Sequence, residues 1–87
     1  MLDSPSGGSR HRLIGLVRQI LEKNSIDRPI SVSDVLSEIG LSSIDMVNLM
    51  LAVEAEFDLT IPQPELTVEN FRSIATIELL VDRLRKS

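Results

Sequence analysis

The stretch from Gly40 to Val47 holds the residues best placed to do chemistry in this chain. It reads Gly-Leu-Ser-Ser-Ile-Asp-Met-Val, and a long helical pattern begins at its two serines. A serine at such a junction should lie at a helix N-terminus, with its side chain pointing outward beside unpaired backbone N–H groups. This position suits the attachment of a group, and of an anionic group in particular.

The sequence offers no local means of activating these serines. The only histidine, His11, lies beside the N-terminal tail and is expected to be exposed on a helix. There is no cysteine, no glycine-rich phosphate loop and no calcium-loop pattern. An unactivated hydroxyl is a poor nucleophile. We therefore expect neither catalysis nor a metal site, and modification would need an external enzyme.

A pair of serines before a helix is also an ordinary capping arrangement, in which Ser42 would accept a hydrogen bond from a nearby backbone N–H. The surrounding residues favour more than this. The stretch from Gly40 to Pro62, GLSSIDMVNLMLAVEAEFDLTIP, resembles the acyl carrier protein family, and helix order extends the resemblance from about Leu13 to Leu84. On that alignment Ser43 is the serine that carries 4'-phosphopantetheine.

The resemblance implies a carrier that is not an enzyme. Acyl groups would ride as thioesters on the thiol end of the arm, and partner enzymes would dock on the second helix. The implied partners are a phosphopantetheinyl transferase and enzymes that load and transfer acyl groups. The residues that match the docking face are Asp45, Val47, Leu51 and Glu54. The interior that would shelter an acyl chain includes Leu49, Met50, Val53, Phe57 and Ile61.

Two positions depart from the family pattern. Ser42 stands where an aspartate usually precedes the modified serine, and Asn48 stands where an acid is frequent on the docking face. These departures argue against the general carrier of fatty-acid synthesis. They favour a specialised free-standing carrier that serves a dedicated pathway of lipid, fatty-acid or polyketide-type synthesis. Two alternatives stay open: a free-standing aminoacyl or peptidyl carrier, and a helical interaction module that is never modified.

The elements that must position Ser43 are helical. The resemblance implies an all-α, acyl-carrier-like bundle of three longer helices and one short helix, with a long packed loop between the first and second helices. Spacing of apolar residues predicts helices from Arg10 to about Asn24, from Ser43 to about Phe57, and after Ser73. A short helix is expected from Glu65 to about Arg72.

The ends of these elements can be predicted in more detail. Residues 1–9 are expected to be a flexible tail and residues 10–87 the carrier domain, with Ser9 capping the first helix. The connection over residues 25–42 is expected to pack on the core, with Ser33 capping a single helical turn. The last helix should bury a stripe made of Ile74, Ile77, Leu80, Val81 and Leu84.

The second helix carries two apolar stripes when its residues are placed 100° apart. The broader stripe should face the core and contains Met46, Leu49, Met50, Val53 and Phe57. A second stripe contains Ile44, Val47 and Leu51. We expect a neighbouring element to cover Ile44, and Val47 and Leu51 to be partly exposed as a docking strip.

Composition and charge agree with this interpretation. Apolar residues make up 43% of the chain and aromatic ones 2%, which favours a helical core. The charged residues from Pro29 to Phe71 are eight acids and no base, which should repel nucleic acid and attract partners with basic patches. No apolar run approaches the roughly 20 residues of a membrane span, and no secretory signal is recognisable. We expect a cytoplasmic monomer.

Overall fold

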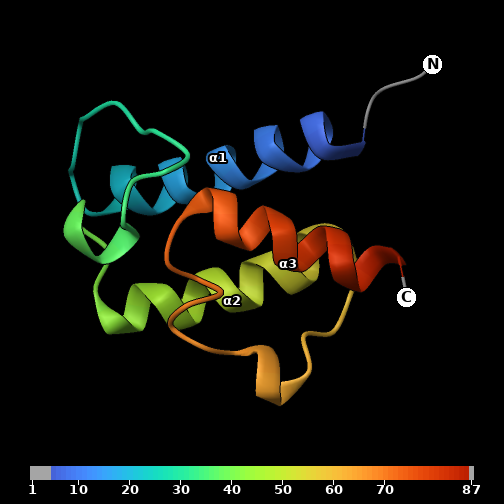
Figure 1. The fold of residues 1–87 in the computed structure, drawn as a ribbon. Helices are drawn as coiled ribbons and strands as arrows, with labels where there is room; N and C mark the ends of the chain where they lie inside the picture. The colour runs from blue at the N-terminus through green and yellow to red at the C-terminus, as the bar shows by residue number, and fades with distance from the viewer. Residues whose placement is uncertain (1–4, 87) are drawn as a thin grey trace.

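The computed structural model describes residues 5–86. Three α-helices and two 3-10 turns follow one another in the order α1 (Pro5–Lys23), η1 (Leu36–Glu38), α2 (Ser43–Phe57), η2 (Gln63–Glu65) and α3 (Ile74–Lys86). The first helix packs on both other helices (Figure 1). The described residues contain no strand, and the predicted all-α bundle is confirmed.

The core lies between the three helices and is completed by the loops. The buried apolar residues of α1 recur every four positions, at Leu13, Val17 and Leu21, as one face of an amphipathic helix requires. The predicted stripe of α3 is buried as well, except that Leu84 lies at its edge. Both phenylalanine rings of the chain are buried.

The first helix begins earlier than the sequence suggests. It begins at Pro5, where the fixed φ of proline and its missing N–H suit the first helical position. Ser9 is therefore not the helix cap. It lies inside α1, is 1% exposed, and accepts a hydrogen bond from Nη1 of Arg85 at 3.3 Å. Of the predicted tail, Met1 to Ser4 lie outside the described residues.

The C-terminal end of α1 is closed by its own backbone. Ser25 adopts a left-handed conformation with φ 60°, and its N–H donates to the carbonyl of Glu22 at 3.0 Å. The next N–H, that of Ile26, donates to the carbonyl of Leu21 at 2.8 Å. These bonds form a Schellman motif, which satisfies the last carbonyls of the helix and turns Ile26 back onto the core.

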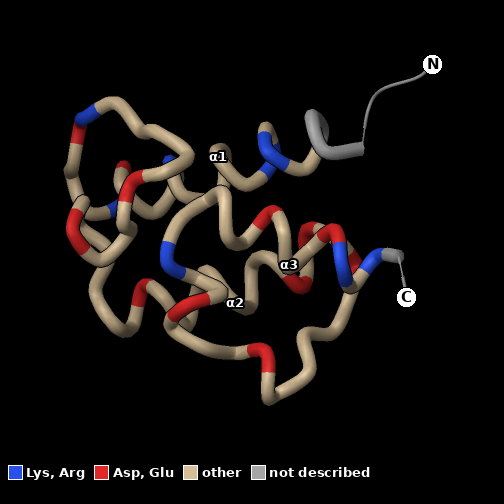
Figure 2. The backbone as a smooth tube through the Cα atoms, in the orientation of Figure 1, with Lys and Arg blue, Asp and Glu red and all other residues tan. Residues whose placement is uncertain are grey.

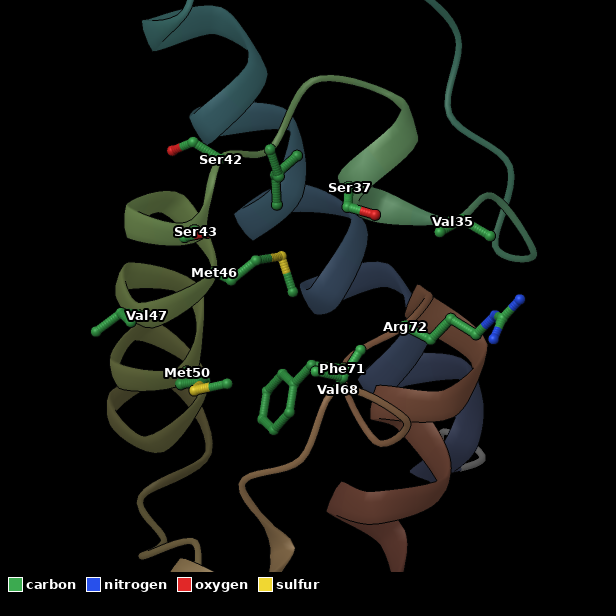
Figure 3. Close-up of a pocket in the computed structure, with 11 residues that line it drawn as sticks. Val35, Ser37, Ser42, Ser43, Met46, Val47, Met50, Val68, Phe71 and Arg72 are labelled. Carbon is green, nitrogen blue, oxygen red and sulfur yellow. The ribbon is translucent and has the colours of Figure 1, made fainter.

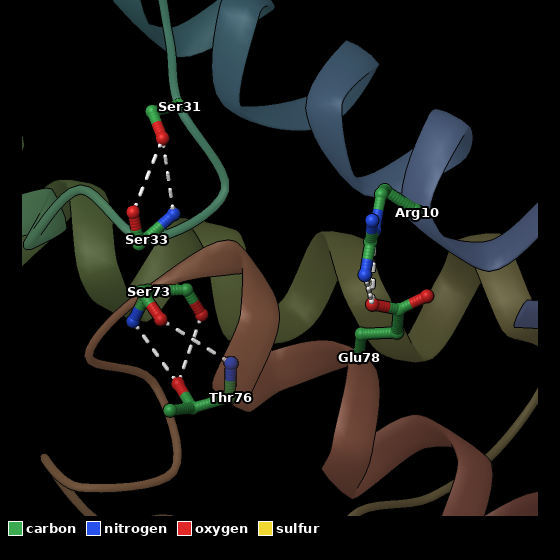
Figure 4. A network of polar contacts seen from close by, with 6 residues as sticks. All are labelled: Arg10, Ser31, Ser33, Ser73, Thr76 and Glu78. Carbon is green, nitrogen blue, oxygen red and sulfur yellow. Dashed lines mark hydrogen bonds and ion pairs between the residues drawn. The ribbon is translucent and has the colours of Figure 1, made fainter. Parts of the chain in front are cut away.

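The long loop between α1 and α2 packs on the core, as predicted. Leu36, Ile39 and Leu41 are buried, and the N–H of Leu36 donates to the carbonyl of Arg72 at 2.9 Å. The expected helical turn is η1, but Ser33 does not cap it. The Ser33 hydroxyl instead lies 3.2 Å from the hydroxyl of Ser31 (Figure 4).

The prediction of a short helix from Glu65 to Arg72 was wrong. A single 3-10 turn, η2, ends at Glu65, and turns follow it up to α3. The side chain of Asn70 donates to the carbonyl of Glu65 at 2.8 Å and to its carboxylate at 3.0 Å. These bonds fold the segment back on itself, which places the ring of Phe71 in the core.

The last helix begins as predicted. The N–H of Thr76 donates to Oγ of Ser73 at 3.3 Å, and the N–H of Ser73 donates to Oγ1 of Thr76 at 3.0 Å (Figure 4). Further along, the buried carboxylate of Glu78 pairs with Arg10 of α1 at 3.0 Å. No helix among residues 5–86 is both long and apolar enough to cross a membrane. The start of α1 and the end of α3 lie on the side of the molecule away from the first turn of α2 (Figure 1).

Candidate functional site

The first turn of α2 is held by a capping box. The N–H of Asp45 donates to Oγ of Ser42 at 3.1 Å, and the N–H of Ser42 donates to Oδ2 of Asp45 at 2.9 Å. Ser42 is thus the predicted cap, and its hydroxyl is engaged. Ser43 is the first residue of α2, is exposed, and makes no side-chain hydrogen bond to any described residue. The two neighbouring serines therefore have different roles.

The exposed hydroxyl of Ser43 fits the attachment of an anionic group. At the first position of a helix the nearby backbone N–H groups lack intrahelical acceptors, and the macrodipole is positive there. A phosphodiester on Ser43 Oγ would lie in this field without displacing any contact of the protein. The hydroxyl of Ser42, in contrast, already accepts the N–H of Asp45, so a group attached there would crowd the cap.

Gly40 lets the loop approach the end of α1 closely just before this site. Its φ is +124°, a conformation that side chains rarely adopt, and a Cβ at this position would lie 2.3 Å from Cδ1 of Ile26. A residue with a side chain would be strained at this φ and would force the end of the Ile26 side chain to move. Gly40 therefore helps to determine where α2 begins.

A third residue, directly after the end of α1, joins this arrangement. The side-chain amide of Asn24 donates to Oδ2 of Asp45 at 2.9 Å and to the carbonyl of Gly40 at 3.4 Å. The bond from the backbone N–H of Ser42, followed by that from Asn24, holds the pKa of Asp45 below its ordinary value of 3.8. Both bonds favour the ionised carboxylate.

This lowered pKa predicts a pH dependence of stability. Because the folded pKa of Asp45 lies below the unfolded one, its stabilising contribution is fully present above the unfolded pKa and is lost as pH falls through the folded value. Asp45→Asn resembles the protonated acid. The difference in free energy of unfolding between wild type and Asp45→Asn should be constant at neutral pH and shrink in acid, as measured by urea denaturation. A difference independent of pH would contradict this.

The charged positions along α2 are acidic (Figure 2). The outer face of this helix also carries exposed apolar residues. Val47 is 54% exposed and Leu51 59% exposed, as expected. Ile44 is 74% exposed, so the prediction that a neighbour covers it was wrong. The preceding loop packs on the core through Ile39 and Leu41, and no described element reaches Ile44.

The two acids of the predicted docking face are engaged by the protein itself. Asp45 belongs to the capping box described above. Glu54 accepts the N–H of Ile61 at 2.8 Å and so holds the chain that leaves α2. Both side chains are half-buried, whereas Val47 and Leu51 lie open to solvent.

A cavity of about 520 Å³ opens beside Ser43 (Figure 3). Met46 and Met50 point into it from α2 toward Phe71, and Val47 points to the other side of the helix. Of the five residues predicted to shelter an acyl chain, only Met50 lines this space. The other four, Leu49, Val53, Phe57 and Ile61, are buried in the core.

Several residues at the site were not predicted. Phe71, Val68 and Arg72 line the cavity from the segment before α3. Asn24 reaches the capping box from the position directly after α1. These contacts depend on how the loops fold, so spacing along the chain gives no sign of them. Among the described residues no group of three or more His, Cys, Asp or Glu could hold a metal ion, and His11 is exposed on α1.

Comparison with known families identifies this arrangement. The model of the family described as "Phosphopantetheine attachment site" matches residues 11–84. The chain belongs to this family of phosphopantetheine-binding carrier proteins. Its cofactor is 4'-phosphopantetheine attached covalently to a serine, and the carrier is not itself an enzyme.

Two similar proteins are named as aminoacyl carriers. Aminoacyl carrier protein 1 of Bradyrhizobium diazoefficiens is 54% identical over 72 residues, which cover 83% of this chain and 80% of the relative. Aminoacyl carrier protein 2 of the same organism is 47% identical over 72 residues, covering 83% of this chain and 81% of the relative.

Two solved structures are similar in fold and sequence. One is the complex of a Bradyrhizobium japonicum glycine:carrier protein ligase with its cognate carrier protein and an analogue of glycyl adenylate. The match has a TM-score of 0.73 and 53% sequence identity, and it covers 85% of this chain and 96% of the matched chain. The other is the complex of a Bradyrhizobium japonicum glycine:carrier protein ligase with glycylated carrier protein. This match has a TM-score of 0.71 and 54% sequence identity, and it covers 82% of this chain and 96% of the matched chain. The acyl-carrier-like fold is thereby confirmed.

Proposed function

We propose that this carrier holds an aminoacyl group as a thioester on a 4'-phosphopantetheine arm attached to Ser43, and presents that group to partner enzymes. The observation that supports Ser43 as the attachment site is its exposed hydroxyl at the start of α2. The neighbouring hydroxyl of Ser42 is engaged in capping. During attachment the Ser43 hydroxyl loses its proton to a phosphopantetheinyl transferase, and its oxygen bonds to the phosphorus of coenzyme A that bears pantetheine. The pyrophosphate bond breaks, and adenosine 3',5'-bisphosphate leaves.

The similarity to aminoacyl carrier proteins supports an amino acid as the cargo, in preference to a fatty-acid or polyketide intermediate. Glycine is the first candidate, because a similar carrier has been solved in glycylated form with a glycine ligase. When bound, the arm would supply the thiol that receives the aminoacyl group from an aminoacyl adenylate as a thioester, with AMP as the leaving group.

The outer face of α2 is the surface we propose for partner docking. Val47 and Leu51 supply exposed apolar area one and two helical turns after Ser43, and Glu54 lies one turn beyond Leu51 on the same side of α2. A partner with an apolar patch and basic residues at its edge would match this surface. We propose that the carrier acts as a monomer, so that this face stays accessible to the transferase and to loading enzymes.

The test proceeds in two steps on the purified full chain. Incubation with coenzyme A, magnesium and a broad-specificity phosphopantetheinyl transferase should add one phosphopantetheine, located on Ser43 by fragment mapping. Incubation of this product with ATP, a glycine:carrier protein ligase and single amino acids should then add one residue, with glycine giving the highest yield in intact mass.

A negative result at the attachment step and one at the loading step would reject different parts of the proposal. No adduct from several transferases on a folded chain would reject the carrier proposal and favour an interaction module that is never modified. An arm that forms on Ser43 but accepts no amino acid from ligases, while accepting acyl groups from acyl-loading enzymes, would reject the aminoacyl cargo alone.

A further inference from the structure

Asn24 has a side chain that the end of α1 does not use. The backbone closes this helix end, because the N–H groups of Asn24, Ser25 and Ile26 all donate to carbonyls of the last turn. The side-chain amide of Asn24 points elsewhere and bonds to Asp45 and Gly40, which lie 21 and 16 residues further along the chain. Its contacts therefore belong to the start of α2 and not to the capping of α1.

These two bonds hold both sides of the Ser42–Ser43 pair. Gly40 lies before the serines and Asp45 after them, so one amide group connects the two flanks of the attachment site to the rigid end of α1. Oδ2 of Asp45 receives both the Asn24 amide and the Ser42 N–H. No described residue bonds to Oδ1, so the carboxylate has one oxygen held by the protein and one available to a partner.

We propose that Asn24 is a positioning residue for the attachment of phosphopantetheine. The inference rests on the proposed role of Ser43. By holding the Gly40 carbonyl and the Asp45 carboxylate, Asn24 keeps the first turn of α2 in the orientation that a transferase must meet. Without it the first turn adopts several orientations, and only the fraction in the correct one binds the transferase productively.

This mechanism predicts which kinetic constant changes. A binding-competent fraction below one weakens apparent affinity in proportion, while the chemical step in the bound complex is unaltered. For Asn24→Ala the KM of the carrier in the transferase reaction should rise about three- to tenfold, the size expected for the net contribution of one solvent-exposed hydrogen bond. The kcat should stay within about twofold of wild type.

Two further variants test the chemistry of the contact. Asn24→Asp keeps the size of the side chain but places a carboxylate against Asp45, so its KM should rise at least as much as that of Asn24→Ala. Asn24→Gln keeps the donor and should recover part of the loss. Gln19→Ala, an exposed change on α1 away from this contact, is the control and should match wild type. Urea denaturation of every variant establishes that each is folded under assay conditions.

A double-mutant cycle identifies the residue through which Asn24 acts. In an Asp45→Ala background, Asn24→Ala should raise KM by much less than it does in wild type. Equal KM values for Asn24→Ala and wild type would overturn the inference, as would a loss confined to kcat or an undiminished effect in the Asp45→Ala background. Wild type must first be modified on Ser43, so failure of the proposed function would be seen before these comparisons begin.

Discussion

Replacing Ser43 by alanine should abolish phosphopantetheine attachment while leaving the free energy of unfolding within about 0.5 kcal/mol of wild type. The side chain is exposed and makes no hydrogen bond to a described residue, so nothing in the fold depends on it. Alanine also has a high helix propensity at this position. Loss of the adduct would therefore report on chemistry and not on unfolding.

The neighbouring serine supplies the matched control. Ser42→Ala removes the hydroxyl that accepts the N–H of Asp45, and should lower the free energy of unfolding by about 1 kcal/mol. Attachment should persist on Ser43 in this variant. Intact mass with fragment mapping gives the adduct, and urea denaturation gives the stability. An adduct on Ser42 in wild type, or on the Ser43→Ala variant, would show that the attachment site is misplaced.

Replacing Phe57 by alanine should lower the free energy of unfolding by about 3–5 kcal/mol, because a large buried ring is removed and its cavity closes only in part. Phe57 is 8% exposed at the end of α2. The guanidinium of Arg12 lies 4.5 Å from the centre of its ring, and that of Arg85 lies 5.8 Å away. The ring thus joins the end of α2 to α1 and α3, and its loss affects all three helices.

Two variants separate the components of this effect. Phe57→Leu keeps most of the apolar volume and removes the cation–π contacts, so it should cost less than half as much as Phe57→Ala. Leu79→Ala removes an exposed side chain of α3 and should change stability by no more than about 0.5 kcal/mol. Denaturation midpoints with unchanged m-values give these differences. A cost for Phe57→Ala as small as that for Leu79→Ala would contradict the buried position of the ring.

Regular spacing of apolar residues predicted the helices well, and local interactions explain where it did not. The rotation of α2 followed from the positions of Leu49, Val53 and Phe57, which are all buried. Proline at position 5 suits a first helical turn, so α1 extends beyond the serine that the sequence suggested as its cap. The helix expected from Glu65 failed because Asn70 bonds back to that residue, and turns take its place.

At the site, contacts between residues close in sequence could be predicted, and contacts between residues distant in sequence could not. Ser42 as the cap follows from short-range rules, because both partners in the capping box lie within three residues of each other. The contact of Asn24 with Asp45 depends on the path of the whole loop between α1 and α2. The same applies to Phe71 and Arg72 beside the cavity, which lie far along the chain from Ser43.

The placement of the helix ends has a practical consequence for handling the molecule. Since α1 begins and α3 ends on the side away from the first turn of α2, an affinity tag, a fluorophore or a surface linker joined before α1 or after α3 would leave that first turn facing solution (Figure 1). An immobilised carrier could then be charged, probed and discharged in place, and binding of successive enzymes to one tethered molecule could be followed directly.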